Sequence, residues 1–87
     1  MIVLFAKKIF VGLKMIKFGE FDDRGLTPRE REVLVLMAKG LNNPEIAKEL
    51  CISKSTAKSH VSSIIRKFEV TNRIEAVLYA IKHGFLD

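Results

Sequence analysis

The chain has no tryptophan and, among its 87 residues, only one cysteine and two histidines. A single cysteine cannot form an internal disulfide, and with two histidines it cannot complete a four-ligand zinc site. We therefore expect no metal and no other cofactor, and the composition favours a cytoplasmic protein. Cys51 follows Leu50 at the end of an apolar helical pattern. A thiol in that position usually behaves as a small buried hydrophobe rather than as a redox group.

The chain also lacks an uninterrupted apolar run that could cross a membrane. Its longest hydrophobic region, residues 2–18, is broken by Lys7, Lys8, Lys14 and Lys17. A spanning helix needs about 18 or more uncharged residues, and a signal peptide keeps its basic residues ahead of the apolar run. Motifs for a bound nucleotide or a catalytic nucleophile are missing as well, so we do not expect an enzyme.

What the chain does have is positive charge. Lysine and arginine number 15 against 10 acidic residues, which gives a net charge of +5. This balance favours a polyanionic partner, either nucleic acid or an anionic membrane surface. The length allows one small domain with a marginal core, and oligomerisation would help to stabilise such a core.

The segment EFDDRG, residues 20–25, separates a hydrophobic basic leader from a strongly patterned remainder. In the leader, MIVLF could form a strand and KKIFVGLKMIKF a basic amphipathic helix interrupted by Gly12. We expect residues 1–25 to be leader and linker, including the pair Asp22 and Asp23, and residues 26–87 to be one domain. An exposed MIVLF would invite aggregation, so the leader should contact this domain, a second copy or a membrane, of which we do not favour the membrane.

Capping patterns predict four helices in the domain. Thr27, Pro28 and Glu30 form a capping box with a first-turn proline, so a first helix should run from Pro28 to about Lys39 and end at Gly40. Asn42 with Glu45 opens a second helix, over 43–50. Ser53 caps a third, over 54–69, and Asn72 with Glu75 opens a last one that closes near Lys82, His83 and Gly84.

The third helix is amphipathic. Its apolar residues fall on one stripe, which comprises Ala57, Val61, Ile64, Ile65 and Phe68. Its opposite face is small or basic, and comprises Ser55, Lys58, Ser59, Ser62 and Arg66. The connection over 51–53 has the length that a helix-turn-helix requires. This polar face suits the major groove of DNA, although such faces are more often simply solvated, or could bind an acidic protein instead.

Four sequence blocks, LTPRERE, GLNNPEIA, ISKSTAKSH and VTNRIEAV, occur in order and at matching spacing. Over residues 26–87 the chain resembles the LuxR-type (GerE-type) helix-turn-helix domain of bacterial response regulators and quorum-sensing regulators. The resemblance implies an all-α, tetrahelical four-helix bundle. Its third helix would read double-stranded DNA in transcription regulation, and its fourth would support a homodimer.

Site residues follow from the helix face and the resemblance together. Base reading is expected from Lys58, Ser59 and Ser62. Contacts to phosphates are expected from Lys54, Ser55, Thr56, Arg66 and Lys67. His60 matches the family histidine, for which a packing or phosphate-side role is expected rather than catalysis. Glu30 and Arg73 also lie on family positions, and we expect them to tie the first helix to the fourth.

The fourth helix carries apolar residues on two sides. Ala76, Val77 and Ala80 should face inward, and the second stripe, expected to form the dimer interface, comprises Ile74, Leu78, Ile81 and Phe85. This stripe could equally cover the leader. Ala57 stands where the family usually has valine, which should loosen the third helix by ~1 kcal/mol. Nothing in the first 25 residues resembles a receiver or ligand-sensing domain, so the chain would be a stand-alone regulator, a remnant of a longer one, or controlled by a partner protein.

Overall fold

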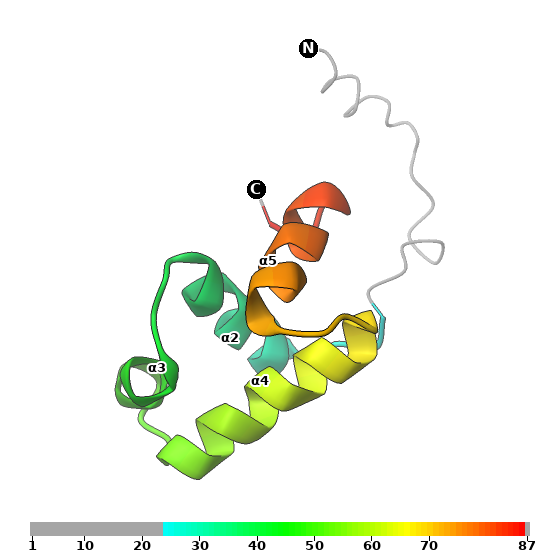
Figure 1. The fold of residues 1–87 in the computed structure, drawn as a ribbon. Coiled ribbons are helices and arrows are strands. Elements are labelled where there is room, and N and C mark those ends of the chain that lie inside the picture. The colour runs from blue at the N-terminus through cyan, green and yellow to red at the C-terminus, as the bar shows by residue number, and fades with distance from the viewer. Residues whose placement is uncertain (1–23, 87) are drawn as a thin grey trace.

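The computed structural model describes residues 24–86. They form four helices, in the order α2 (Pro28–Ala38), α3 (Asn43–Leu50), α4 (Lys54–Phe68) and α5 (Arg73–Lys82), and no strand (Figure 1). The predicted all-α fold is confirmed, and each predicted helix is present with ends within one residue of those expected. The interpretations of residues 1–23 lie outside the described residues.

The helices begin where their capping residues indicate. In α2 the Thr27 hydroxyl accepts a bond from the Glu30 amide, and Glu30 Oε1 accepts one from the Thr27 amide, each at 3.0 Å. Asn42 and Glu45 form the same reciprocal pair at 2.9 and 2.8 Å. Ser53 caps α4. Because these bonds link residues three apart, they depend on local sequence rather than on tertiary packing.

The turn between α3 and α4 depends on Cys51. This residue ends α3 in the left-handed conformation, with φ 57° and ψ 45°. A left-handed residue reverses the direction of the chain at a helix end, and its side chain then leaves the helix's buried face. Cys51 is exposed, so the prediction of a buried thiol is wrong.

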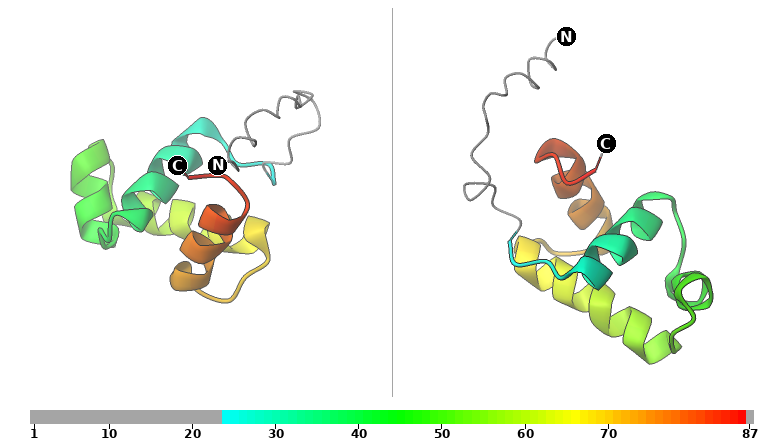
Figure 2. Two further views of the ribbon diagram at one scale, coloured as in Figure 1. Left: turned by 90° about the horizontal axis from the view of Figure 1, so that it is seen from above. Right: turned by 180° about the vertical axis from the view of Figure 1, so that it is seen from behind.

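The core lies between α4 and the other three helices, all of which pack against it (Figures 1 and 2). Four of the five predicted stripe residues of α4 are buried, namely Ala57, Val61, Ile64 and Phe68. Ile65 is half-buried against the same core. The other helices contribute Val33, Leu34, Met37, Ile46, Ala47, Ala76 and Ala80. Burying the α4 stripe leaves the polar side of the helix facing outward, which confirms its predicted orientation.

Aromatic contacts hold the end of α5 against α4. The ring of Phe68 lies 4.5 Å from that of Tyr79 and 5.0 Å from that of Phe85, measured between centroids. Phe85 is half-buried in this contact, so it belongs in part to the core rather than only to the outer stripe expected for it. Within residues 24–86 no helix is long and apolar enough to cross a bilayer.

Candidate nucleic-acid interface

The outer side of α4 gathers nearly all the residues predicted to contact DNA. Seven of the eight are exposed, and they come from successive turns of one helix: Lys54, Ser55, Thr56, Lys58, Ser59, Ser62 and Arg66. The eighth, Lys67, is half-buried. No acidic residue occurs between Lys54 and Phe68, so the exposed side of the helix carries only cationic or neutral groups. We call the seven exposed residues the α4 polar face.

The first turn of α4 presents a group of hydroxyls. Ser53 Oγ accepts the Thr56 amide at 3.0 Å, donates to Thr56 Oγ1 at 2.8 Å, and lies 3.2 Å from Ser55 Oγ. A hydroxyl that accepts a bond can still donate its own hydrogen. Together with the positive end of the helix dipole and the Lys54 ammonium, these hydroxyls suit the oxygens of a phosphate.

The middle of the α4 polar face differs from its ends. Lys58, Ser59 and Ser62 are exposed and lie between the hydroxyl-rich first turn and Arg66. Two of these three side chains are short, so a helix can approach the floor of a groove closely beside them. Lys58 adds a long cation that can reach acceptor atoms on a guanine edge.

Lys67 has a different environment from the other cations of α4. Its Nζ lies 2.7 Å from Glu30 Oε1 and donates to the carbonyl oxygen of Gly25 at 2.8 Å. Its side chain is 25% exposed. The ammonium is therefore directed toward the protein, and this geometry does not support the phosphate contact expected from the sequence.

Glu30 is the buried partner of that cation, with 5% of its surface exposed. The Ser63 hydroxyl donates to its second oxygen, Oε2, at 2.7 Å. Burial raises the pKa of the Glu30 carboxyl, but bonds from Lys67, the Thr27 amide and Ser63, together with the nearby charge of Lys67, outweigh burial and hold the pKa below its ordinary value. Glu30 therefore stays ionised and joins α2 to α4.

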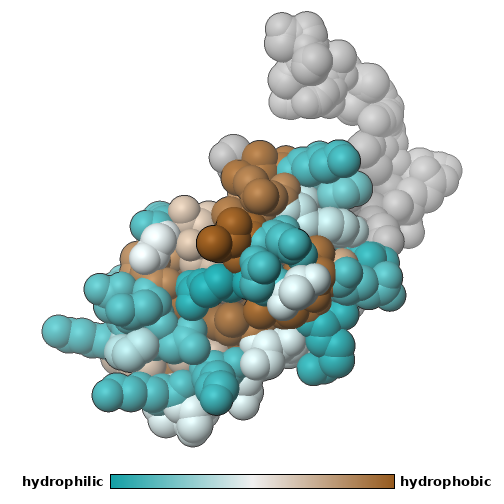
Figure 3. Space-filling view, in the orientation of Figure 1, coloured by the Kyte–Doolittle hydropathy of each residue, from teal (hydrophilic) through white to brown (hydrophobic). Residues whose placement is uncertain are grey.

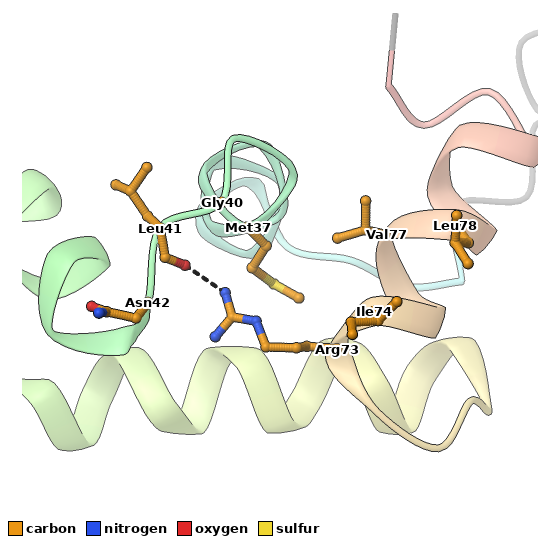
Figure 4. A pocket seen from close by; sticks show the side chains of 8 residues that line it. All are labelled: Met37, Gly40, Leu41, Asn42, Arg73, Ile74, Val77 and Leu78. Atoms are coloured by element: carbon orange, nitrogen blue, oxygen red, sulfur yellow. Dashed lines mark hydrogen bonds between the residues drawn. The ribbon is translucent and has the colours of Figure 1, made fainter.

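Arg73 joins a different pair of elements. Its Nη2 donates to the carbonyl oxygen of Leu41 at 2.6 Å (Figure 4). Its Nη1 donates to Asn43 Oδ1 at 3.0 Å. Arg73 thus ties α5 to the α2–α3 connection, whereas Glu30 ties α2 to α4. The expectation that both residues tie the first helix to the fourth is wrong.

Sequence reasoning missed Ser63 as a partner of Glu30. Ser63 and Lys67 are four residues apart on α4, and such residues lie on the same side of a helix. That spacing shows that they could share one partner, but it does not identify Glu30. His60, for which a packing or phosphate-side role was expected, is half-buried.

The outward side of α5 is apolar. Ile74 is 68% exposed, Leu78 60% and Ile81 58%, and a hydrophobic patch lies over this helix in Figure 3. Beside it, a groove of about 390 Å³ separates α5 from the end of α2. Figure 4 shows its lining, which includes Met37, Leu41, Ile74, Val77 and Leu78. Three of the four predicted dimer residues are therefore exposed together, and the fourth, Phe85, is half-buried.

The sequence of the domain matches a known family of proteins. Residues 24–80 match the sequence family described as bacterial regulatory proteins, luxR family. The response regulator protein VraR of Staphylococcus aureus is 49% identical over 61 residues, which cover 70% of this chain and 29% of that protein. VraR of Staphylococcus epidermidis matches to the same extent. The chain thus spans less than a third of the length of these relatives.

Solved structures also resemble the fold, among them those of a transcription factor and a response regulator. That of the transcription factor GerE has a TM-score of 0.67 and 35% identity, and the match covers 71% of this chain and 92% of that one. That of the response regulator ChrA, from a heme-sensing two-component system, has a TM-score of 0.68 and 35% identity. It covers 71% of this chain and 31% of the regulator.

Proposed function

Because the chain belongs to the luxR family of bacterial regulatory proteins, whose domain is a DNA-binding transcription regulator, we propose that α4 enters the major groove of a specific duplex sequence. The observation that carries the proposal is the α4 polar face, which is exposed along the whole helix and has no acidic residue. A groove about 12 Å wide accepts a helix with short polar side chains and a few cations. The family is a family of DNA-binding regulators, not of enzymes.

The α4 polar face divides into two kinds of contact. Lys58, Ser59 and Ser62 lie in the middle, where side chains would face base edges and confer sequence preference. The ends would meet phosphates, and comprise Lys54, Ser55 and Thr56 at the start of the helix and Arg66 near its finish. Phosphate contacts position the helix on the duplex, whereas contacts to base edges select the sequence.

A homodimer through α5 is the second part of the proposal. The exposed stripe of Ile74, Leu78 and Ile81 has the i, i+4, i+7 spacing of one helix face. The adjoining groove against α2 could receive apolar side chains of a second copy. Phe85, which also packs on Phe68, would lie at the margin of this interface. Two copies would present two α4 helices to two half-sites.

We also propose the division of the chain into a leader and linker, residues 1–25, and a DNA-binding domain, residues 26–87. The relatives that are response regulators are more than three times as long as the matched segment. Control of DNA binding would come from a partner protein, or from additional sequence such as the longer response regulators have.

Replacement of Lys58 by alanine tests the assignment of the base-reading residues. We expect affinity for a preferred duplex to fall by ~1 to 3 kcal/mol, with preference relaxed at one base position, because a lysine contact to guanine is lost. Affinity for a scrambled duplex should change much less. Binding to both duplexes is measured across a salt series, after the preferred sequence has been selected from a random library.

Arg66→Ala is the matched control, because it removes one cation from the same exposed face. It should weaken both duplexes about equally and reduce the salt slope by roughly one. Equal losses on the two duplexes for Lys58→Ala would contradict the assignment. Absence of salt-dependent duplex binding by the parent chain would instead favour an acidic protein as the partner of this face.

A further inference from the structure

One cluster of polar groups joins α4 to α2 and to the chain entry, which both lie more than 30 residues earlier in the sequence. Glu30 on α2 accepts bonds from Ser63 and Lys67 on α4, at 2.7 Å each. Lys67 also donates to the carbonyl oxygen of Gly25 at 2.8 Å, where the chain enters the domain. We call Glu30, Ser63 and Lys67 the clamp.

The clamp is a rigid connection because its central charge is buried. Glu30 is 5% exposed, and each carboxylate oxygen has a donor within 2.7 Å. Glu30 Oε1 also accepts the Thr27 amide at 3.0 Å, so the same carboxylate fixes the first turn of α2. Removing one partner leaves a buried charge without compensation, which the folded state strongly disfavours. Movement of α4 along or around α2 would break these bonds.

The clamp residues of α4 are immediate neighbours of the α4 polar face. Ser63 follows Ser62, and Lys67 follows Arg66. Because adjacent residues of a helix are held at a fixed angle to one another, the clamp sets the direction in which Ser62 and Arg66 point. Base readout requires side chains within about 0.5 Å of their productive positions, so a small rotation of α4 would be felt first in sequence preference.

A second contact supports the connection to the chain entry. Arg24 Nη2 lies 3.6 Å from Glu69 Oε1 at the end of α4, and its guanidinium lies 5.6 Å from the ring centre of Tyr79 on α5. Residues 24 and 25 are therefore held on the same end of α4 by two separate cations. Both residues adopt positive φ, 58° and 76°, a conformation that is costly for arginine and needs such contacts to persist.

We propose that Glu30, Ser63 and Lys67 are positioning residues for DNA recognition, which orient α4 for base reading and couple the chain entry at residues 24–25 to that orientation. The proposal rests on the proposed function, since it needs α4 to be the DNA-reading helix. In this role Lys67 acts through Glu30 and does not touch the duplex.

Charge makes the proposal testable, because a positioning role and a purely electrostatic role predict opposite signs for Glu30→Gln. Removing an acidic group near a DNA surface would by charge alone strengthen binding to every duplex. If Glu30 positions α4, the variant instead binds the preferred duplex more weakly than the parent does, by on the order of tenfold. Its affinity for the scrambled duplex should not fall below that of the parent. Glu49→Gln, which removes an exposed acid from α3, is the matched control and should strengthen both duplexes equally.

Two further variants keep the test decisive if Glu30→Gln does not fold. Ser63→Ala leaves every charge in place, and it should lower preference for the selected duplex in the same direction as Glu30→Gln. Lys67→Met should lower preference with an unchanged salt slope, whereas a phosphate contact would reduce the slope by roughly one. A reduced slope with unchanged preference for Lys67→Met, or unchanged preference for Ser63→Ala, overturns the proposal.

Cleavage by trypsin after Arg24 tests the coupling to the chain entry. A preferred duplex should slow cleavage of the bond between Arg24 and Gly25 in the parent, and Lys67→Met should abolish this protection, because binding to one of two coupled sites must affect the other. The cleaved fragment is identified by mass spectrometry. Lys82→Met, which removes an exposed cation of α5 outside both the clamp and the α4 polar face, is the control and should keep the protection. Equal protection in Lys67→Met and the parent overturns the coupling, while absence of duplex binding by the parent would refute the proposed function itself.

Discussion

Glu30 carries a charge that is almost completely removed from water, and three donors compensate it. Burial alone would raise the pKa of its carboxyl. The bonds from Lys67, the Thr27 amide and Ser63, with the charge of Lys67, reverse that effect, and the pKa lies below its ordinary value. A group of this kind stabilises the folded state through its ionised form, and the stabilisation depends on pH.

We expect the stabilisation from Glu30 to be present above the pKa of an unfolded glutamic acid, about 4.3. It should be lost as the pH falls from there through the lower pKa of the folded state, because protonation releases Lys67. Thermal unfolding of the parent and of Glu30→Gln is compared from pH 7 downward. The parent should be more stable at pH 7, and the difference should shrink toward acid pH. A difference that stays constant would show that the charge of Glu30 does not stabilise the fold.

Glu30 also shows where sequence reasoning stopped at the scale of residues. Its bond to the Thr27 amide was predicted, because a capping box lies within four consecutive residues. Its partners Ser63 and Lys67 are 33 and 37 residues away, and only the packing of α2 on α4 brings them together. In the sequence, Lys67 could not be distinguished from the other cations of α4, because helical spacing does not show whether a lysine forms an ion pair within the protein or faces solvent.

At the scale of elements, the helices were predictable because their boundaries depend on nearby residues. The caps Asn42 and Ser53 bond to amides three residues on, and α3 and α4 begin where those residues indicate. The α4 polar face followed from the helical period of the opposite, buried stripe. The hydrogen bonds between helices could not be predicted in this way, because the partners of Arg73 lie 30 and 32 residues away in the sequence.

Replacement of Arg73 by methionine should destabilise the domain by about 2 kcal/mol, because two hydrogen bonds from a charged group are lost and the start of α5 loses its tie to the α2–α3 connection. Arg73→Lys should recover only part of this, since an ammonium lacks the planar fork that reaches Leu41 and Asn43 together. The measurement is urea unfolding at neutral pH.

Arg29→Met is the matched control for Arg73→Met. Arg29 forms an exposed ion pair with Glu32 one turn away, at 2.9 Å. Surface pairs of this spacing contribute about 0.5 kcal/mol or less. If the two methionine variants lose similar stability, the bonds of Arg73 are not a structural tie, and the loss reflects only the removal of a positive charge.

At the scale of the whole molecule, the buried core and the exposed apolar stripe lie on different sides of α5. Ala76 and Ala80 are completely buried, whereas Ile74, Leu78 and Ile81 are more than half exposed. A helix that is apolar on two sides needs two partners, and within residues 24–86 only one side has a partner. The sequence predicted both faces from their spacing, but it could not distinguish a second copy from the leader as the cover.

Replacement of Leu78 by glutamate tests the dimer, because it introduces a charge at the centre of the stripe without touching the α4 polar face. We expect binding to a duplex with two half-sites to weaken far more than binding to a single half-site, since only the former uses contacts between copies. Lys82→Gln is the control, because it lowers the net charge by the same amount at another exposed position of α5. Lys82→Gln should weaken both duplexes slightly and equally.

Sedimentation of the free protein adds a second measurement: the Leu78→Glu variant should sediment as a monomer at concentrations where the parent is a dimer. Equal losses on the two duplexes, with unchanged sedimentation, would contradict dimerisation through α5 and favour the leader as the segment that covers this stripe.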